Sequence, residues 1–315
     1  MAAAVVGGEW TDGAVRFETG SDAVNRLVST KPSGAYGSKV AAAYERLQHS
    51  GRPEQVKKEW ESLCGQVELA SSNRCDRAVT DDAFLGACWW LLESRMLIEI
   101  EQAVIGQIGR MTFFYPKGVK MGLDAKAYLR ERYVADGMLA KPLSGQALPS
   151  AFALYLGIVD GKGAESAADG LKAALEAGPI PRIGAFEWRI VLDALSWYGK
   201  ADAAYGLLLK RPDGIDNGAA LSFLWRTAAG IASDPTNPGF RNVIMAPRPD
   251  RRLGFVKAEY KSAAGLIKSA WRYEGKKWIW DFTVPRKSTA SVTLPGESFA
   301  RHYDAGDHHV ELEVD

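Results

Sequence analysis

The sequence changes its hydrophobic period near the stretch SDPTNPGF, residues 233–240. Before it, from Gly37 onward, apolar residues recur at the three- and four-residue spacing of amphipathic helices. After it, short segments rich in β-branched and aromatic residues alternate with a period of two between turn residues. This order predicts a mainly α chain with a β appendage, a helical domain at residues 1–239 and a β domain at residues 240–315.

The helical part is punctuated by glycine and proline. KVAAAYERLQHSG ends a helix at Gly51, and Pro53 begins the next at a favourable first-turn position. The longest predicted helix starts after Thr80 as N-cap, and its first half is apolar nearly all round, as in the inner helix of a helical barrel. Further helices are predicted at 124–134, 146–159, 164–177, 186–198, 201–210 and 218–231. Antiparallel helices joined by short turns form an α-hairpin array or toroid.

The beginning of the chain gives weak periodic signals, whereas the C-terminal part alternates clearly with a period of two. The first forty residues are rich in Gly, Ser and Thr and are predicted to be mostly loop. Five strands are predicted in RNVIMAPRP, LGFVKAEYKS, GLIKSAWRYE, KKWIWDFTVP and STASVTLP. His308 and His309, close to an acidic C-terminus, are expected to lie in a solvated tail.

Composition excludes several classes of protein. Hydrophobic residues at 47%, charged residues at 24% and a net charge of +1 describe an ordinary globular chain. Lysine and arginine are scattered, so no nucleic-acid partner is expected. The longest apolar run, ALPSAFALYLGIV, is too short to span a membrane. The N-terminus MAAAVVGGEW lacks the features of a secretory signal, and a cytoplasmic location is expected.

The cysteines and histidines show no metal-binding pattern. Cys64, Cys75 and Cys88 are odd in number and lack a CxxC spacing, so they are expected to be buried thiols. The four histidines form no HExxH motif. No metal and no cofactor are therefore predicted.

Three stretches resemble the bacterial α-L-rhamnosidases of glycoside hydrolase family 78. FEWRIVLDALSWYGKADAAYGLLLK is similar to late barrel helices of that family, and AAGIASDPTNPGFRNVIMAPRP with the strands after it is similar to its last barrel segment and C-terminal sandwich. TDDAFLGACWWLLESRMLIEIEQAVIG is similar to a central barrel helix. With the helix at 147–159, the resemblance covers residues 36–295. It implies an (α/α) barrel of the six-hairpin type, open or incomplete because few helices are predicted, followed by a small antiparallel β-sandwich.

The resemblance also implies catalytic positions that this sequence lacks. Family rhamnosidases invert at the sugar carbon, so one carboxyl group protonates the leaving oxygen and another activates water. The family's general-acid segment, in an early part of the barrel, has no counterpart in this sequence. Its base, in a Trp-Glu motif followed by an Asn-His stretch, falls where this chain has the short RPDGIDNGAA, residues 211–220. Where the family tends to have Trp-Gly-Asp, this chain reads Tyr36-Gly37-Ser38.

Glu187 and Trp188 stand where the family has a small Gly-Thr pair, just before the helix RIVLDALS. A carboxylate and an indole at this end of an inner helix narrow the sugar pocket and make it more apolar. Glu187 is thus a catalytic candidate and Trp188 a substrate-binding one. Alternatively, Glu187 complements the helix N-terminus and Trp188 fills the space of a deleted loop.

Two more carboxylates complete the catalytic candidates. Glu93 lies one turn after Trp89 on the same helical face, where burial would raise its pKa and make it a general acid. The alternative is a salt bridge to an arginine of a neighbouring helix. Asp216, in the short loop, either supplies a carboxylate to the pocket mouth or is a turn residue. The other substrate-binding candidates are aromatic residues that either wall the pocket or pack in the core: Trp89, Trp90, Trp225, Tyr36 and Trp10.

Three functions remain open. The first is a repurposed rhamnosidase-like enzyme with an aromatic-lined pocket, performing non-hydrolytic acid–base chemistry of the lyase, isomerase or cyclase type on a small ring-shaped or apolar molecule. The second is an α-L-rhamnosidase-type hydrolase with relocated carboxylates. The third is a non-catalytic sugar- or product-binding module. The expected partner is a small-molecule substrate, and the sequence is compatible with a homo-oligomer.

Overall fold

The computed structural model describes residues 15–29, 38–72, 81–106, 117–178, 181–210 and 214–314. By contacts the chain divides into two compact units. The helical unit comprises Gly37–Tyr44 and Pro53–Ala204, and the sandwich unit comprises Met1–Tyr36, Glu45–Arg52 and Tyr205–Asp315, each as far as it is described. This division does not coincide with the expected boundary at residue 240, because elements from the N-terminus and from residues 205–228 pack with the sheets.

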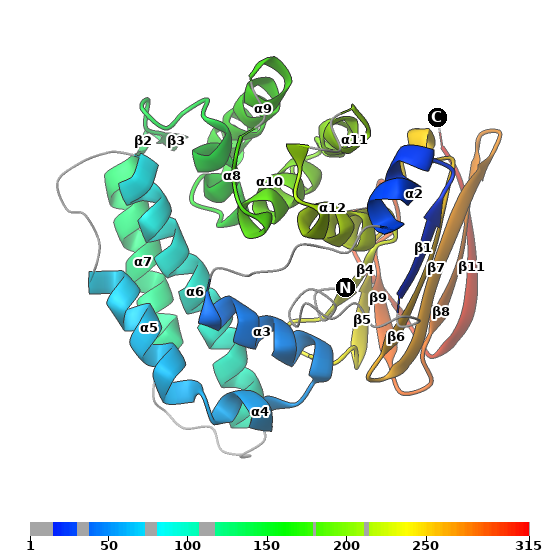
Figure 1. Cartoon of the computed structure of the whole chain (residues 1–315), viewed down its shortest axis with the longest axis horizontal. Coiled ribbons are helices and arrows are strands. Elements are labelled where there is room, and N and C mark those ends of the chain that lie inside the picture. The colour runs from blue at the N-terminus through cyan, green and yellow to red at the C-terminus, as the bar shows by residue number, and fades with distance from the viewer. Residues whose placement is uncertain are drawn as a thin grey trace. The chain divides into compact units, whose positions relative to one another are not determined.

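The helical unit is built from helices that pack against one another (Figure 1). They are α4 (Pro53–Lys57), α5 (Trp60–Ser72), α6 (Asp81–Gly106), α7 (Lys117–Tyr133), α8 (Ala147–Tyr155), α9 (Gly161–Ala177) and α10 (Ala185–Trp197). A short hairpin of β2 (Val134–Ala135) and β3 (Met138–Leu139) follows α7. Helix α6 contacts α4, α5, α7 and α8, so the helix predicted to be buried on several sides is so placed.

Helices α3 (Lys39–Ser50) and α11 (Ala201–Lys210) each begin in the helical unit and end in the sandwich unit. Both end where the sequence predicts. The helix predicted at 218–231 is shorter: α12 (Asn217–Phe223) continues as one π-helical turn, η2 (Leu224–Ala228). Gly230 then adopts a left-handed conformation, φ +74°, which ends the helix and leads into a strand.

The sandwich unit contains two sheets. The five-stranded sheet has the order β1 (Val15–Thr19), β6 (Phe255–Ser262), β7 (Gly265–Glu274), β8 (Lys277–Val284) and β11 (Gly306–Glu313). The four-stranded sheet has the order β10 (Arg301–Tyr303), β9 (Thr289–Val292), β5 (Asn242–Met245) and β4 (Ile231–Ser233). All pairs are antiparallel except β5 with β9. The fold class, mainly α with a β-sandwich, is confirmed, although the sandwich is not purely antiparallel.

The prediction that the first forty residues are mostly loop is wrong for its described part. Strand β1 pairs along its whole length with β6, and α2 (Asp22–Ser29) packs against β1 and α12. A short strand at the edge of a sheet is specified by its partner more than by its own residues. The local signal was therefore weak.

The core of the sandwich unit is aromatic. Trp278, Trp280 and Phe282 lie on one face of β8 as predicted and are buried, with the rings of Trp280 and Phe282 stacked at 4.3 Å between centroids. Buried polar contacts order this core: the Ser269 hydroxyl accepts a hydrogen bond from the Trp280 indole (2.9 Å) and donates one to a backbone carbonyl after η2, the Ala229 oxygen (2.6 Å). Every polar group in this chain of contacts is thus satisfied within the core.

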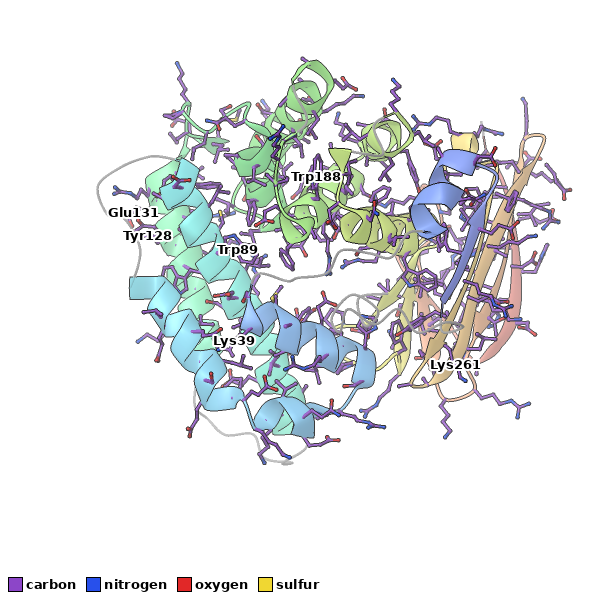
Figure 2. The ribbon with its side chains drawn as sticks, in the orientation of Figure 1. Lys39, Trp89, Tyr128, Glu131, Trp188 and Lys261 are labelled. Atoms are coloured by element: carbon purple, nitrogen blue, oxygen red, sulfur yellow. The ribbon has the colours of Figure 1, made fainter. Side chains whose placement is uncertain are left out.

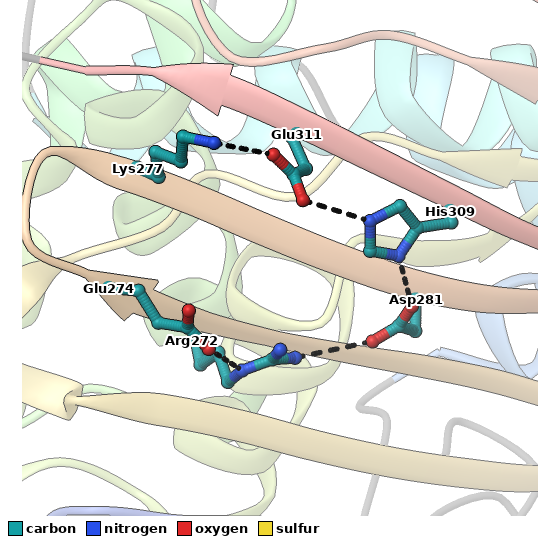
Figure 3. A network of polar contacts seen from close by, with 6 residues as sticks. All are labelled: Arg272, Glu274, Lys277, Asp281, His309 and Glu311. Carbon is teal, nitrogen blue, oxygen red and sulfur yellow. Dashed lines mark hydrogen bonds and ion pairs between the residues drawn. The ribbon is translucent and has the colours of Figure 1, made fainter.

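His308 and His309 do not lie in a solvated tail; they belong to β11, which pairs with β8. On the solvent face, His309 Nδ1 lies 2.6 Å from Asp281 Oδ1, and the Asp281 carboxylate, followed by that of Glu311, raises the pKa of His309. Figure 3 shows the wider network, in which Arg272 also reaches Asp281 (3.3 Å) and Lys277 reaches Glu311 (2.9 Å). Acidic residues that suggested a free tail are paired across strands.

Within the described residues no helix has the length and apolar character to cross a bilayer, and no three His, Cys, Asp or Glu side chains gather as metal ligands. Cys64 and Cys88 are buried, and burial raises the pKa of Cys88. Cys75 lies outside the described residues.

Candidate functional site

Glu93 on α6 is a half-buried carboxyl group with a specific partner. The hydroxyl of Ser38 donates a short hydrogen bond to Glu93 Oε1, and the same hydroxyl accepts from the backbone N–H of Ala41 (3.4 Å) in the first turn of α3. Burial raises the pKa of Glu93, and the Ser38 hydrogen bond opposes that shift. Within the described residues its partner is this hydroxyl, not the arginine of the salt-bridge alternative.

Trp89, one turn before Glu93 on the same face of α6, joins three helices. Its ring centroid lies 5.1 Å from that of Phe186 on α10 and 6.0 Å from that of Phe152 on α8. We refer to Trp89, Phe152 and Phe186 as the ring cluster. Trp89 is half-buried, whereas the two phenylalanines are buried. The helical period places Glu93 on the same face of α6 as an indole that keeps part of its surface exposed.

A buried ion pair adjoins the ring cluster on α10. The guanidinium carbon of Arg189 lies 5.8 Å from the Phe186 ring centroid, and Arg189 Nε lies 3.9 Å from Asp193 Oδ2. Both side chains are almost fully buried. The site therefore combines aromatic faces, a carboxyl group with a raised pKa and a cation held by its own carboxylate.

Trp90 and Trp188 do not line this site. Trp90 is 3% exposed and its ring packs edge-on against Tyr128 of α7, a different neighbour from those of Trp89. Trp188 is 1% exposed in α10 (Figure 2). Adjacent residues on a helix point about 100° apart, so Trp89 and Trp90 diverge. Both Trp90 and Trp188 are core side chains, which corrects the expectation of one pocket walled by all of these indoles.

Glu187 is placed by its own helix. It is half-buried in the first turn of α10, and its Oε2 lies 2.7 Å from the position that a Cβ on Gly184 would occupy. The carboxylate thus folds back over the helix N-terminus, where the helix dipole favours a negative charge. This geometry supports the helix-terminus alternative for Glu187.

Asp216 and Trp225 lie in the sandwich unit, where each has a structural role. Asp216 is the N-cap of α12, where its Oδ1 accepts from the backbone N–H groups of Gly218 (2.8 Å) and Ala219 (3.2 Å). Trp225 is 2% exposed and contacts the rings of Phe17 and Tyr260. The geometry therefore does not place Asp216 at a pocket mouth or Trp225 in a pocket wall. Tyr36 and Trp10 lie outside the described residues.

Sequence reasoning missed the partners of Glu93 and Trp89. In the comparison with the Trp-Gly-Asp motif, Ser38 counts only as the loss of a carboxylate. A serine directly before a helical pattern is, however, an N-cap signal, and this signal could have indicated an ordered hydroxyl group. Phe152, Phe186 and the Arg189–Asp193 pair carry no local signal, because apolar residues and i, i+4 ion pairs are common on any helix.

Both the sequence and the fold of this chain are similar to those of known proteins. The profile of the bacterial α-L-rhamnosidase C-terminal domain matches residues 230–309. An α-L-rhamnosidase of Streptomyces avermitilis is 28% identical over 80 residues, which is 25% of this chain and 8% of that protein. The solved structure of a Streptomyces avermitilis α-L-rhamnosidase with L-rhamnose has the same fold over 87% of this chain, with a TM-score of 0.70 and 16% identity. The resemblance to glycoside hydrolase family 78 is confirmed.

Other solved α-L-rhamnosidase structures agree. The α-L-rhamnosidase of Aspergillus terreus gives a TM-score of 0.68 at 16% identity, and that of Dictyoglumus thermophilum gives 0.69 at 14% identity, each over 87% of this chain. This chain covers 32%, 38% and 39% of the three solved chains. At these identities the likeness establishes the family 78 fold, and it does not by itself transfer the activity of the longer proteins.

Proposed function

We propose that the helical unit binds a small ring-shaped molecule against the ring cluster and that Glu93, in its neutral form, donates a proton to it in non-hydrolytic acid–base chemistry of the lyase, isomerase or cyclase type. The observation that carries this proposal is the Glu93 carboxyl group, whose pKa burial raises, held by the Ser38 hydroxyl one turn from a half-exposed indole. A carboxylic acid that stays neutral at higher pH can donate a proton.

Each neighbour of Glu93 has a defined part in this chemistry. The Ser38 hydroxyl fixes one carboxyl oxygen, so that the other oxygen is left to carry the proton. The exposed part of Trp89 offers a flat apolar face to a ring. Arg189 lies 3.9 Å from Asp193 and both are buried, so this ion pair is a fixed neighbour of the ring cluster rather than a mobile cation.

Inverting hydrolysis requires more than the described residues of this site supply. It needs a second carboxylate about 6.5–9.5 Å from the acid to activate water. Glu187 and Asp216, the other candidates, interact with their own helix termini. A single proton donor beside aromatic faces is compatible with rearrangement or with binding alone, which makes rhamnoside hydrolysis the less favoured function.

A binding and turnover experiment separates these functions, with L-rhamnose and an aryl α-L-rhamnoside as probes. We expect L-rhamnose to bind the wild-type protein and to change chemically on incubation, as followed by proton NMR. Trp89→Ala should weaken binding about tenfold, the loss expected for one stacking indole. Glu93→Gln should keep the binding and slow the chemical change about 10²-fold.

Two exposed side chains of the helical unit provide matched controls. Trp197→Ala removes a 44% exposed indole that stacks on Tyr155, and Glu131→Gln neutralises an exposed carboxylate of α7 (Figure 2). Both should behave as wild type. Binding without any chemical change would support the non-catalytic module, release of nitrophenol that depends on Glu93 would support the hydrolase, and no binding of either probe would overturn the proposal.

A further inference from the structure

An open groove of about 860 Å³ lies at one end of the five-stranded sheet. Three segments of the sandwich unit form it: the β6–β7 turn, residues 261–266; the end of β8 with the residues after it, 283–287; and the turn before β11, residues 305–307. Lys261 marks this end of the sheet in Figure 2. The groove is separate from the ring cluster, which belongs to the helical unit.

The walls of the groove are held in place by local contacts. The Ser262 hydroxyl donates to the Gly265 carbonyl (2.8 Å) and accepts from the Ala264 N–H (3.2 Å), which fixes the β6–β7 turn. Gly265 has φ +135°, and a Cβ there would lie 3.0 Å from Pro285 Cβ. The turn therefore packs directly against the segment after β8, and the groove is preformed.

The charge around the groove is positive. Lys261, Arg286 and Lys287 are exposed, and among the described residues no carboxylate forms an ion pair with any of them. Other cations of the same sheet are paired, for example Arg272 with Glu274 (2.8 Å). The groove has one acidic residue, Asp307, which accepts a hydrogen bond from the Thr283 hydroxyl (2.6 Å). The lining thus carries two net positive charges.

The apolar part of the lining lacks flat aromatic faces. It consists of Leu266, 42% exposed, together with Val284, Pro285 and alanines. Sugars bound without an anionic group depend strongly on ring stacking, which this lining does not offer. A volume of this size belongs to the range of small-molecule sites, which is larger than a single inorganic anion requires.

We propose that this groove binds a small organic anion, with a phosphate-ester or carboxylate group held by Lys261, Arg286 and Lys287 and a compact body against Leu266 and Pro285. Arginine and lysine bind such groups through charge-assisted hydrogen bonds. The wall from which these cations project is preformed, so the backbone of the site needs little ordering when the ligand arrives. This site is independent of the proton-donor chemistry proposed for Glu93.

The test compares glucose 6-phosphate, glucuronate and glucose by isothermal titration at fixed ionic strength. Wild-type protein should bind at least one of the two anions and bind glucose much more weakly; the preferred anion identifies the anionic group. The triple variant Lys261→Gln, Arg286→Gln, Lys287→Gln should lose about tenfold or more in affinity. Ala264→Trp, which fills the groove without changing charge, should also lose binding.

A second triple variant controls for general charge effects. Lys257→Gln, Arg272→Gln, Lys277→Gln removes the same number and kinds of cation from the same sheet, away from the groove. It should keep wild-type affinity, and thermal melts should show that all variants are folded. Equal losses in the two triple variants, unaltered binding by Ala264→Trp, or no binding of either anion to the wild type would each overturn the proposal.

Discussion

Replacing Gly230 by alanine is expected to destabilise the sandwich unit by more than about 4 kcal/mol, a large part of the free energy of unfolding of an ordinary domain. Gly230 has φ +74°, and an added Cβ would lie 2.6 Å from the carbonyl carbon of Ala246 and from Pro247 Cα. These atoms are backbone and cannot rotate away. The Gly230 carbonyl also accepts from the Ala246 N–H (2.8 Å), so the two segments are held together.

Gly275 provides the matched control. It lies in the β7–β8 turn with φ +61°, and a Cβ there would meet nothing within 4 Å. Gly275→Ala should therefore cost only the conformational term, about 1–2 kcal/mol. Urea denaturation followed by tryptophan fluorescence measures both variants. Equal effects of the two substitutions would mean that the close approach at Gly230 does not exist in solution.

Trp271→Ala should be the next most damaging change, with a loss of about 3–5 kcal/mol in the free energy of unfolding. Trp271 is 1% exposed on β7, and its indole N–H donates to the Ala228 carbonyl at the end of η2 (2.6 Å). Trp271→Phe keeps most of the volume but leaves this carbonyl without its donor, at a cost of about 1–3 kcal/mol.

An exposed aromatic residue of the same unit provides the control for Trp271. Phe299→Ala removes a ring that is 59% exposed in the same unit and should change the unfolding free energy by less than about 0.5 kcal/mol. If Trp271→Phe is as stable as the wild type, the hydrogen bond to Ala228 contributes nothing to the folded state.

Local patterns predicted most of the fold. The helix expected at 186–198 is α10, Ala185–Trp197, and that expected at 201–210 is α11, Ala201–Lys210. Strands β6, β7 and β8 follow their alternating segments. Strands β1 and β11 were missed because each is an edge strand specified by the inner strand it pairs with, β6 or β8, and such pairing over long sequence distances leaves little trace in a short segment.

The candidate site was predicted in part. Glu93 and Trp89 were placed on one helical face by their spacing, and the structure keeps them there. The partner of Glu93 lies 55 residues away at Ser38, which no local pattern specifies. Glu187 and Asp216 are carboxylates in the first turn or at the cap of a helix, where a structural role competes with a catalytic one, and the geometry of both follows the structural role.

The raised pKa of Glu93 has a consequence for stability. Between the ordinary glutamate pKa and the raised one, the folded state holds a proton that the unfolded chain has lost. The stability that Glu93 contributes is therefore complete below its ordinary pKa and is lost as the pH rises through the folded-state pKa. Glu93→Gln removes this dependence, so its unfolding free energy should vary less with pH over that window than that of the wild type.

The most direct test of whether this rhamnosidase-like fold carries a neutral acid beside its ring cluster is a carbon-13 NMR titration of the Glu93 side-chain carboxyl. The resonance is assigned by its absence from the spectrum of Glu93→Gln. We predict a midpoint above the ordinary value of 4.5, and a further rise in Ser38→Ala, since the Ser38 hydrogen bond lowers the pKa. A midpoint at or below 4.5 in the wild-type protein would contradict a proton-donor role for Glu93.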